Sequence, residues 1–294
     1  MVSVLVDSSE RPESSDDGVL YVVATPIGNL SDCSPRAIDV LRSVDVVAAE
    51  DTRHTGSLLT HFGFKKRLIS LHAHNERAQT QGLIAELKKG CSIALVSDAG
   101  TPLLSDPGFP LVVAAGQSAI RVVPIPGPSA VIAALSAAGL PCDRFVFEGF
   151  LPARSGPRKK HLKALLGEPR TLVFYESPHR IESSIADLVQ VFGRERHAVI
   201  ARELTKTFEQ FYRGTLEELQ AWLRDDANHR RGEFVLMVQG GEIPLGGQYP
   251  DSPLLAVLLD YMSVKQASQA AARITGKPKK ELYQQAVALK QSML

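Results

Sequence analysis

The amino-acid sequence predicts an α/β protein with a parallel-sheet domain, a second α/β domain with a mixed sheet and a small C-terminal helical appendix. Short apolar runs alternate with helical segments up to residue 139, which is typical of a parallel sheet with helices on both faces. Between residues 171 and 238 there are fewer helices per strand, which favours a mixed sheet. The 294 residues exceed one typical hydrophobic core, so two domains are expected.

The first domain is expected over residues 18–150, after a disordered tail over residues 1–17 that is acidic and serine-rich. Helices are predicted between its strands, with Ser31, Asp32 or Ser34 available to cap the first helix and glycines ending several others. The polar loops that follow parallel strands should meet at one edge of the sheet. The predicted strands are apolar, often β-branched runs at 19–24, 44–49, 67–71, 92–96, 120–125 and 145–150.

The second domain is expected over residues 151–241, with a basic segment at its start. Its predicted strands lie at 171–175, 198–202, 208–214 and 233–238, and its helices at 181–192 and after Thr215, which should form a capping box with Glu218. Residues 242–294 are expected to form a linker and a helical appendix, with short helices at 254–262, 264–274 and 278–291. The appendix fits a helix-turn-helix contact with nucleic acid and a support for a dimer equally well.

One loop, S-D-A-G-T-P-L-L-S-D-P-G at 97–108, carries the densest set of candidate binding residues. It follows the strand at 92–96, so Asp98, Thr101, Ser105 and Asp106 should lie at the carboxyl edge of the sheet, where α/β proteins bind ligands. The motif E-D-T-R at 50–53 follows the strand at 44–49 and forms a second part of this edge. An ordinary βα turn is the alternative interpretation of the loop.

Several chemistries lack a motif in this chain. There is no G-x-x-x-x-G-K, no G-x-G-x-x-G after the first strand, no G-x-S-x-G and no H-E-x-x-H. The three cysteines form no C-x-x-C pair, so we expect no metal site and a reducing compartment. No apolar run is long enough to span a membrane, and a net charge of +1 gives no overall footprint for nucleic acid. A rigid pocket of prolines, small residues and carboxylates suits a ligand with an adenosine half and a charged half.

Five motifs in one order resemble a known enzyme family. They are L-Y-V-V-A-T-P-I-G-N-L at 20–30, A-E-D-T-R at 49–53, S-D-A-G-T-P at 97–102, P-G-P-S-A at 126–130 and Y-E-S-P-H-R at 175–180. Together they look like the bacterial small-subunit ribosomal RNA (cytidine 2′-O)-methyltransferases, a group within the tetrapyrrole-methylase-like class of S-adenosylmethionine-dependent enzymes. The resemblance runs from residue 20 to residue 240 and more loosely through the appendix.

The resemblance implies a cytoplasmic enzyme, usually a homodimer, with S-adenosylmethionine in a cleft between its two α/β domains. The implied reaction is 2′-O-methylation of a cytidine in 16S ribosomal RNA within the 30S subunit. Asp98 would face the polar end of the cofactor. The residues implied to line the cofactor site are Pro26, Ile27, Asp98, Ala99, Gly100, Thr101, Ser129, Ala130, Phe174 and Tyr175.

Candidates for a general base, or for orienting the 2′-hydroxyl, lie at predicted strand ends and loops: Asp51, Glu176, Glu203 and Lys206. Lys206 with a lowered pKa beside Glu203 is one possibility, and an ion pair at the domain cleft is the alternative for each candidate. Positioning should supply roughly 7–11 kcal/mol of the barrier reduction. A base should add about 3–5 kcal/mol.

RNA recognition is expected to combine phosphate contacts with a splayed-out cytidine, for which His179 and Tyr175 are the nearest aromatic rings. The expected phosphate contacts are Arg53, Arg154, Arg158, Lys159, Lys160 and Arg180. Two other functions are open at this point. The same fold could methylate a tetrapyrrole or a protein residue, and a non-catalytic sensor could bind an adenosine ligand and contact RNA through the appendix.

Overall fold

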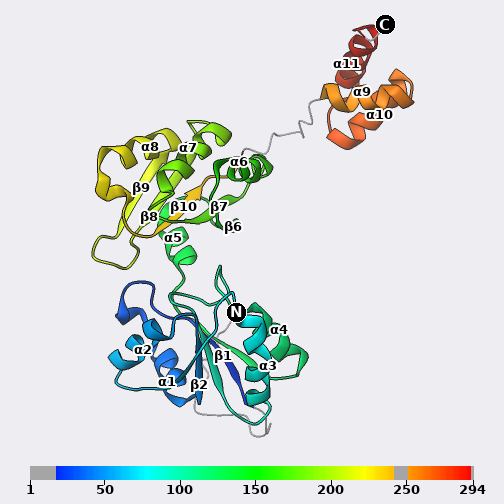
Figure 1. Cartoon of the computed structure of the whole chain (residues 1–294). Helices are drawn as coiled ribbons and strands as arrows, with labels where there is room; N and C mark the ends of the chain where they lie inside the picture. Colours follow the sequence, from blue (N-terminus) through cyan, green and yellow to red (C-terminus); the bar gives the residue numbers. More distant parts are fainter. Residues whose placement is uncertain (1–17, 242–250, 293–294) are drawn as a thin grey trace, which may run out of the picture.

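Two α/β domains follow one another along the chain, and three helices close it (Figure 1). The computed structural model describes residues 18–241 and 251–292. The predicted tail over residues 1–17 lies outside the described residues, as do residues 242–250 of the segment in which a linker was predicted. The predicted α/β class, with a parallel-sheet domain, a mixed-sheet domain and C-terminal helices, is confirmed.

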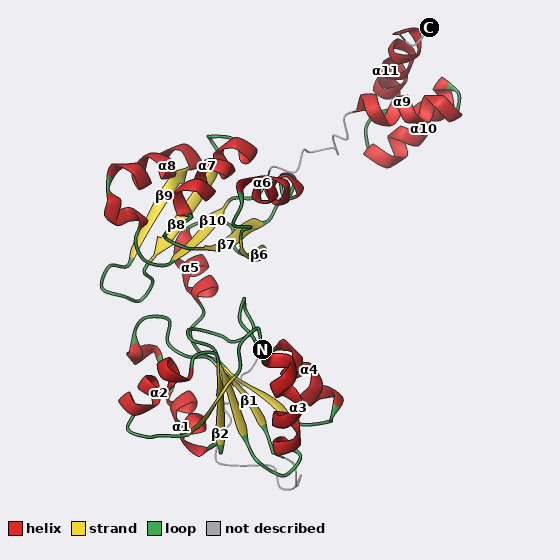
Figure 2. Cartoon of the chain, in the orientation of Figure 1, coloured by secondary structure: helices red, strands yellow, loops and turns green. Residues whose placement is uncertain are grey.

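The first sheet has five parallel strands in the order β3-β2-β4-β1-β5. Apolar side chains on alternate positions of these strands bury both faces, one beneath α1 and α2 and the other beneath α3 and α4 (Figure 2). The strands are β1 (Leu20–Val23), β2 (Val46–Ala49), β3 (Arg67–Ser70), β4 (Ile93–Val96) and β5 (Val122–Ile125). The helices are η1 (Leu30–Asp32), α1 (Pro35–Ser43), α2 (Thr52–His61), α3 (Glu76–Leu87) and α4 (Phe109–Gln117).

Two predicted helix starts are confirmed by their caps. In α1, Ser34 Oγ accepts a hydrogen bond from the Ala37 N–H at 3.1 Å, and Pro35 occupies the first helical position, where no backbone donor is needed. The predicted capping box begins α8 (Leu216–Asp225), where Thr215 and Glu218 each accept a hydrogen bond from the backbone N–H of the other. Local sequence therefore fixes where these helices begin.

The second sheet is mixed and has the order β6-β7-β10-β8-β9. Only the β6–β7 pair is parallel. One face packs against α6, α7 and α8, and the other packs against α5. The strands are β6 (Phe145–Phe150), β7 (Thr171–Glu176), β8 (His197–Arg202), β9 (Gln210–Thr215) and β10 (Phe234–Val238). The helices are α5 (Ala130–Ala138), α6 (Ser155–Ala164), α7 (Ile181–Phe192) and the 3-10 helix η2 (Ala227–Arg230) after α8.

The predicted domain boundary after residue 150 is wrong. Strand β6 does not end the first sheet but pairs with β7 in the second. Helix α5 also belongs there, because Val131, Ala134 and Leu135 pack against β8 and β10. The chain leaves the first sheet after β5. An apolar run predicts a strand but not its sheet, because strand pairing depends on residues distant in the sequence.

The basic segment that follows β6 forms helix α6, although no helix was expected there from its sequence pattern. Pro157 lies in the first turn, where proline is tolerated. Arg158 and Leu162 are four residues apart on one face of this helix, and both are buried.

The three predicted C-terminal helices are present as α9 (Asp251–Tyr261), α10 (Val264–Thr275) and α11 (Lys279–Ser292). They pack on one another around Leu255, Ala271, Leu282 and Ala286. Across residues 18–241 and 251–292, no helix is both long enough and apolar enough to cross a membrane.

Candidate active site

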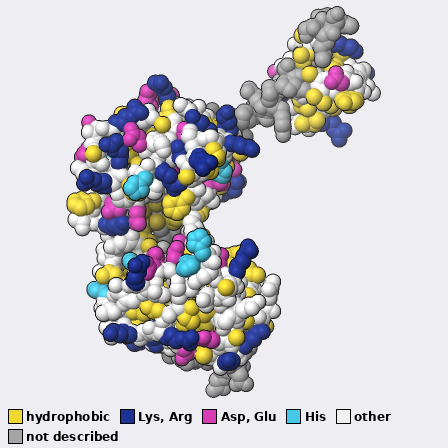
Figure 3. All heavy atoms as spheres, in the orientation of Figure 1, with side chains coloured by type: hydrophobic (Ala, Val, Ile, Leu, Met, Phe, Trp, Pro, Cys, Tyr) yellow, Lys and Arg dark blue, Asp and Glu magenta, His cyan; other side chains and the backbone are white. Residues whose placement is uncertain are grey.

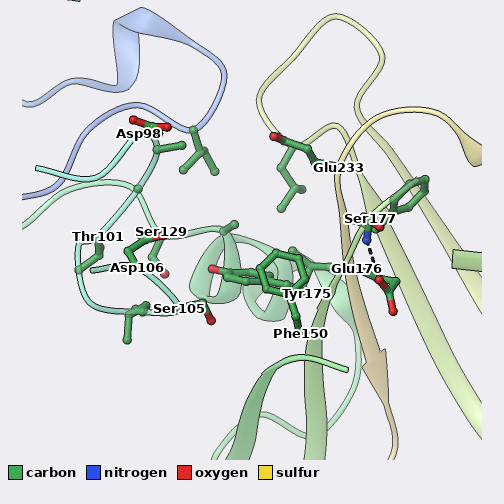
Figure 4. Close-up of a pocket in the computed structure, with 18 of the residues that line it drawn as sticks. Asp98, Thr101, Ser105, Asp106, Ser129, Phe150, Tyr175, Glu176, Ser177 and Glu233 are labelled. Atoms are coloured by element: carbon green, nitrogen blue, oxygen red, sulfur yellow. Dashed lines mark hydrogen bonds between the residues drawn. The ribbon is translucent and has the colours of Figure 1, made fainter. Parts of the chain in front are cut away.

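A pocket of about 460 Å³ lies between the carboxyl edge of the first sheet and the second sheet. The loops that follow β1, β2, β4 and β5 contribute Ile27, Glu50, the 98–106 segment and Ser129. The second domain contributes the ends of β6 and β7 together with residues of β8, β10 and their loops. Figure 4 shows the loop of Asp98, Thr101 and Asp106 on one side of the pocket, and Tyr175, Phe150 and Glu233 on the other.

Backbone hydrogen bonds hold the loops of the first domain together. The Thr25 N–H donates to the Gly100 carbonyl at 2.9 Å, and the Gly100 N–H donates to the Thr25 carbonyl at 3.1 Å. Gly100 has a φ of +82°, and a Cβ there would lie 3.2 Å from Ile27 Cγ2. The Thr101 hydroxyl donates to the Pro128 carbonyl at 3.1 Å. The loops after β1, β4 and β5 therefore form one rigid edge.

Three carboxylates give this edge a negative charge. Asp98 accepts a hydrogen bond from the Asp51 N–H at 2.9 Å. Burial raises the pKa of Asp106 to about 6, and the charges of Glu50 and Asp98 add to the rise. Burial and the charge of Asp98 also raise the pKa of Glu50. Because these groups repel one another, a cation between them would be stabilised.

The opposite wall is largely apolar. Ala201, Leu204 and Val235 line it, and Tyr175 packs edge-on against Phe147 with ring centroids 4.9 Å apart. Burial raises the pKa of Tyr175 to about 12, so its hydroxyl stays neutral. In the described part of the chain, the Ser129 hydroxyl at the base of the pocket is buried with no hydrogen-bond partner. A ligand atom at that point would satisfy it.

The residues proposed for the cofactor divide into three groups. The pocket is lined by Ile27, Asp98, Ala99, Gly100, Thr101, Ser129, Ala130 and Tyr175. Pro26 is not among the lining residues. The proposal for Phe174 is wrong, because its fully buried side chain packs on the α7 face of the sheet. Successive side chains of a strand point to opposite faces of the sheet, so the Phe174 side chain points away from the face that carries Tyr175.

Asp51 lies outside the pocket and is held by Arg53. Its carboxylate accepts hydrogen bonds from Arg53 Nε at 3.1 Å and Nη2 at 2.7 Å. These hydrogen bonds hold the pKa of Asp51 far below its usual value. A carboxylate with so low a pKa is a weak base, so its position favours the ion-pair interpretation.

Glu176 is one of the residues that line the pocket, but its side chain is fully buried and its carboxylate is engaged by neighbouring groups. It accepts hydrogen bonds from the Ser184 hydroxyl at 2.6 Å and the Ser177 N–H at 2.8 Å, and it pairs with Arg180 at 3.0 Å. Every one of these partners belongs to β7, α7 or the turn between them. The carboxylate therefore fixes this turn and is not directed at a substrate.

Glu203 and Lys206 form an ion pair, as the alternative interpretation had it. Lys206 Nζ lies 2.9 Å from Glu203 and 2.8 Å from Glu233. Partial burial acts to lower the pKa of Lys206, but the two carboxylates outweigh it and the pKa is raised. The suggestion of a lowered pKa is therefore wrong, and this lysine is protonated at neutral pH. A Cβ on Gly28 would lie 2.5 Å from Lys206 Cγ. The loop that carries Lys206 in the second domain therefore packs against the first domain as well.

The proposed phosphate contacts also separate by exposure. The Arg158 side chain is 2% exposed and pairs with Asp187, so its assignment to RNA is wrong. Lys159 also pairs with Asp187, and Arg180 is partly buried beside Glu176. Arg53, Arg154 and Lys160 are exposed, as a phosphate contact requires.

Comparison with known proteins identifies the family. Residues 19–220 match the tetrapyrrole (corrin/porphyrin) methylases, and residues 252–290 match the RsmI C-terminal HTH domain. The ribosomal RNA small subunit methyltransferase I of Escherichia coli O157:H7 is 52% identical over 285 residues, covering 95% of this chain and 98% of that protein. The chain belongs to the ribosomal RNA small subunit methyltransferase I family. The Pseudomonas aeruginosa member is 55% identical over 273 residues, covering 92% of this chain and 97% of its own length.

Solved structures of tetrapyrrole methylases and related enzymes share the fold of this family member. Diphthine synthase aligns with a TM-score of 0.57 at 16% identity, covering 76% of this chain and 90% of that one. Uroporphyrin-III C-methyltransferase from Thermus thermophilus, complexed with S-adenosylhomocysteine, aligns with a TM-score of 0.53 at 18% identity, covering 77% and 98%. At these identities the likeness concerns the fold alone.

The chain is a methyltransferase that uses S-adenosylmethionine, and its pocket fits that cofactor. The carboxylates of Glu50, Asp98 and Asp106 suit its positive charge. The apolar wall of the second domain suits its adenosine half, and the unpartnered Ser129 hydroxyl offers a hydrogen bond.

The affinity of the protein for its cofactor is expected to depend on pH through Asp106. Its carboxyl group is charged only above its pKa of about 6, so a cationic ligand binds more tightly above that pH. The Kd for S-adenosylmethionine should rise as pH falls through this value, by no more than about tenfold per pH unit for one proton. Calorimetric titrations from about pH 5 to pH 8 would measure it.

Asp106→Asn should flatten this pH profile, whereas Asp39→Asn, which removes an exposed carboxylate of α1, should leave it unchanged. A profile that Asp106→Asn does not alter would assign the titration to another group.

Proposed function

We propose that this protein transfers a methyl group from S-adenosylmethionine to the ribose 2′-oxygen of a cytidine in the 16S ribosomal RNA of the 30S subunit. The observation that carries the proposal is the interdomain pocket, acidic on one wall and aromatic on the other, in a chain about half identical to ribosomal RNA small subunit methyltransferases I. The acidic wall suits the charged half of the cofactor, and the opposite wall offers apolar and aromatic surface for its adenosine half and for an acceptor nucleoside.

Methyl transfer requires the 2′-oxygen to lie in line with the methyl group that the bound cofactor supplies. Asp98 and the backbone of Ala99 to Thr101 would hold the cofactor against the edge of the first sheet. Asp51, Glu176, Glu203 and Lys206 are all engaged in ion pairs, which favours a reaction driven by orientation. Orientation alone supplies roughly 7–11 kcal/mol in well-aligned reactions.

RNA contacts outside the pocket are proposed for exposed basic residues. Lys and Arg side chains spread over the second domain and appear on the C-terminal helices (Figure 3), and the match of residues 252–290 to a helix-turn-helix domain favours nucleic acid as the partner of those helices. Arg53, Arg154 and Lys160 are the residues proposed for phosphate contact. The protein has a net charge of only +1. We therefore expect it to recognise the shape of an assembled particle in addition to the phosphate charge of the RNA.

A cytoplasmic homodimer is also part of the proposal. Phe109 and Val113 lie one turn apart on α4 and are 68% and 38% exposed. Exposed apolar side chains on one helix face support an interface between two copies of the chain.

The proposed reaction would be tested by tritium transfer from labelled S-adenosylmethionine to purified 30S subunits, with free 16S ribosomal RNA and tetrapyrrole and protein substrates in parallel. Nuclease digestion and mass spectrometry would identify the labelled nucleoside. We expect 2′-O-methylcytidine, formed faster on the 30S subunit than on free RNA. Label in a tetrapyrrole or protein alone would replace the proposed substrate, and cofactor binding without any transfer would favour the sensor.

A further inference from the structure

The pocket carries an exposed aromatic ring at the end of β6. Phe150 lines the pocket, yet 53% of the residue is accessible to solvent. The rings that the sequence suggested for stacking are placed differently. Tyr175 is partly buried behind Phe150, and His179 does not line the pocket. Phe150 therefore presents an apolar ring to whatever enters the pocket.

An irregularity in β6 turns Phe150 toward the pocket. Phe147 lies beside Val173 in the β6–β7 ladder, but the register then shifts and Gly149 lies beside Phe174. Phe150 consequently lies beside Tyr175, on the face that forms the pocket wall. Without the extra residue, Phe150 would lie beside Glu176, whose side chain points to α7.

Glycine is favoured at this bulge. Gly149 has a φ of +64°, a region that other residues adopt at a cost. A Cβ there would also lie 2.9 Å from the Ser105 hydroxyl in the loop of the first domain. The bulge thus brings β6 close to the loop after β4 and directs Phe150 into the space between the domains.

Neighbouring groups hold the ring in place. The Phe150 and Tyr175 rings have centroids 5.5 Å apart, and the Arg180 guanidinium lies 5.9 Å from the Phe150 centroid. Arg180 is itself fixed by the buried Glu176 carboxylate at 3.0 Å and by the Leu151 carbonyl at 3.3 Å. Glu176 therefore holds Arg180, and Arg180 in turn contacts the ring. The ring is preorganised while its free surface stays open.

We propose that Phe150 is the platform on which the target nucleobase stacks once it has left the RNA stack. The inference rests on the proposed function and deepens it. A base that leaves its neighbours loses stacking energy, and an enzyme recovers that loss by stacking the base on an aromatic side chain. The exposed ring stands at the pocket and opposite the carboxylates that suit the cofactor, which is where the base of an acceptor nucleoside would lie.

The test compares Phe150→Ala, Phe150→Leu and Phe150→Tyr with wild-type protein. For methylation of 30S subunits, we expect kcat/KM to fall about 10-fold to 100-fold in the alanine variant. Leucine should restore little of this loss because it lacks a π face, and tyrosine should retain most of the activity. The Kd for S-adenosylmethionine and the Tm should stay at wild-type values. Phe208→Ala, which removes a ring that is 69% exposed and lies outside the pocket lining, is the matched control and should act like wild type.

Binding of 30S subunits in the presence of S-adenosylhomocysteine would be measured alongside turnover. Wild-type protein that binds the subunits without methylating them contradicts the proposed reaction, and the platform is then judged by whether Phe150→Ala weakens that binding. A leucine variant as active as wild type would reduce the role of Phe150 to apolar bulk. A rise in the Kd for S-adenosylmethionine that matches the loss of kcat/KM would assign Phe150 to the cofactor wall. Either result overturns the platform.

Discussion

Arg158→Ala is expected to destabilise the second domain by about 3–5 kcal/mol, the usual cost of removing one partner of a buried ion pair. Arg158 and Asp187 are 2% and 7% exposed at their side chains, and their closest atoms are 2.7 Å apart. The substitution would leave the buried Asp187 carboxylate without its main partner, with only Lys159 at 3.3 Å and the Ser155 hydroxyl beside it. Thermal denaturation should report a Tm lower by roughly 2–4 °C for each kcal/mol.

The network around Arg158 explains why so large an effect is expected. Its Nη1 donates to the carbonyls of Pro152 and Ala153, and its Nη2 donates to the Ser183 hydroxyl at 3.2 Å. Asp187 also accepts from Ser155. One guanidinium thus joins the turn before α6 to α7, and no smaller side chain can make these contacts together.

Arg154→Ala is the matched control, since this arginine lies four residues earlier and is exposed. It should leave Tm unchanged and weaken binding to the 30S subunit. Should Arg158→Ala keep the wild-type Tm and lose RNA affinity, the residue would be a phosphate contact after all.

Much of the fold could be predicted because its signals are local. Apolar runs followed by glycine or polar loops predicted the strands, and Ser34 and Thr215 predicted helix starts. The sheet to which β6 belongs could not be predicted, because its pairing with β7 joins segments distant in the sequence. Arg158 was misassigned for the same reason: its partner Asp187 lies 29 residues further along the chain, and most arginines are exposed.

The site shows the same division between local and non-local signals. The rule that parallel strands present their carboxyl ends at one edge predicted that the loop at 97–108 and the E-D-T-R motif at 50–53 would lie together, as Asp98 and Glu50 do in the pocket. Sequence gave no sign of Phe150, because a regular β6 would direct it to the opposite face. The alternation of β7 could have separated Phe174 from Tyr175, since the side chains of two adjacent strand residues point to opposite faces of the sheet.

Asp98→Asn is expected to weaken S-adenosylmethionine binding by at least about tenfold, or about 1.4 kcal/mol. Asparagine has nearly the same shape, and its side-chain oxygen can still accept the hydrogen bond from the Asp51 N–H, which is 2.9 Å long. The substitution therefore removes charge while it preserves the loop. Two charges 4 Å apart interact by about 4 kcal/mol near a protein surface, so a loss of this size is within reach. Isothermal titration calorimetry would measure the Kd.

Greater ionisation of the neighbouring Asp106 carboxyl group should offset part of the loss of cofactor affinity in Asp98→Asn. The charge of Asp98 is one of the causes that raise the pKa of Asp106, so its removal should lower that pKa from about 6 and leave Asp106 more fully ionised. The pH at which cofactor affinity falls should therefore move down in Asp98→Asn.

S-adenosylhomocysteine distinguishes where the lost charge acts, because this ligand keeps the ammonium group and lacks the sulfonium charge. A loss shared by both ligands would indicate that Asp98 faces the ammonium group, and a loss confined to S-adenosylmethionine would indicate the sulfonium. Asp39→Asn, which removes an exposed carboxylate of the same domain, should change neither Kd. Unchanged affinity of Asp98→Asn for both ligands would contradict a role for this carboxylate in binding the cofactor. The role of Asp98 would then be limited to accepting the hydrogen bond from the Asp51 N–H, which holds the backbone after β2.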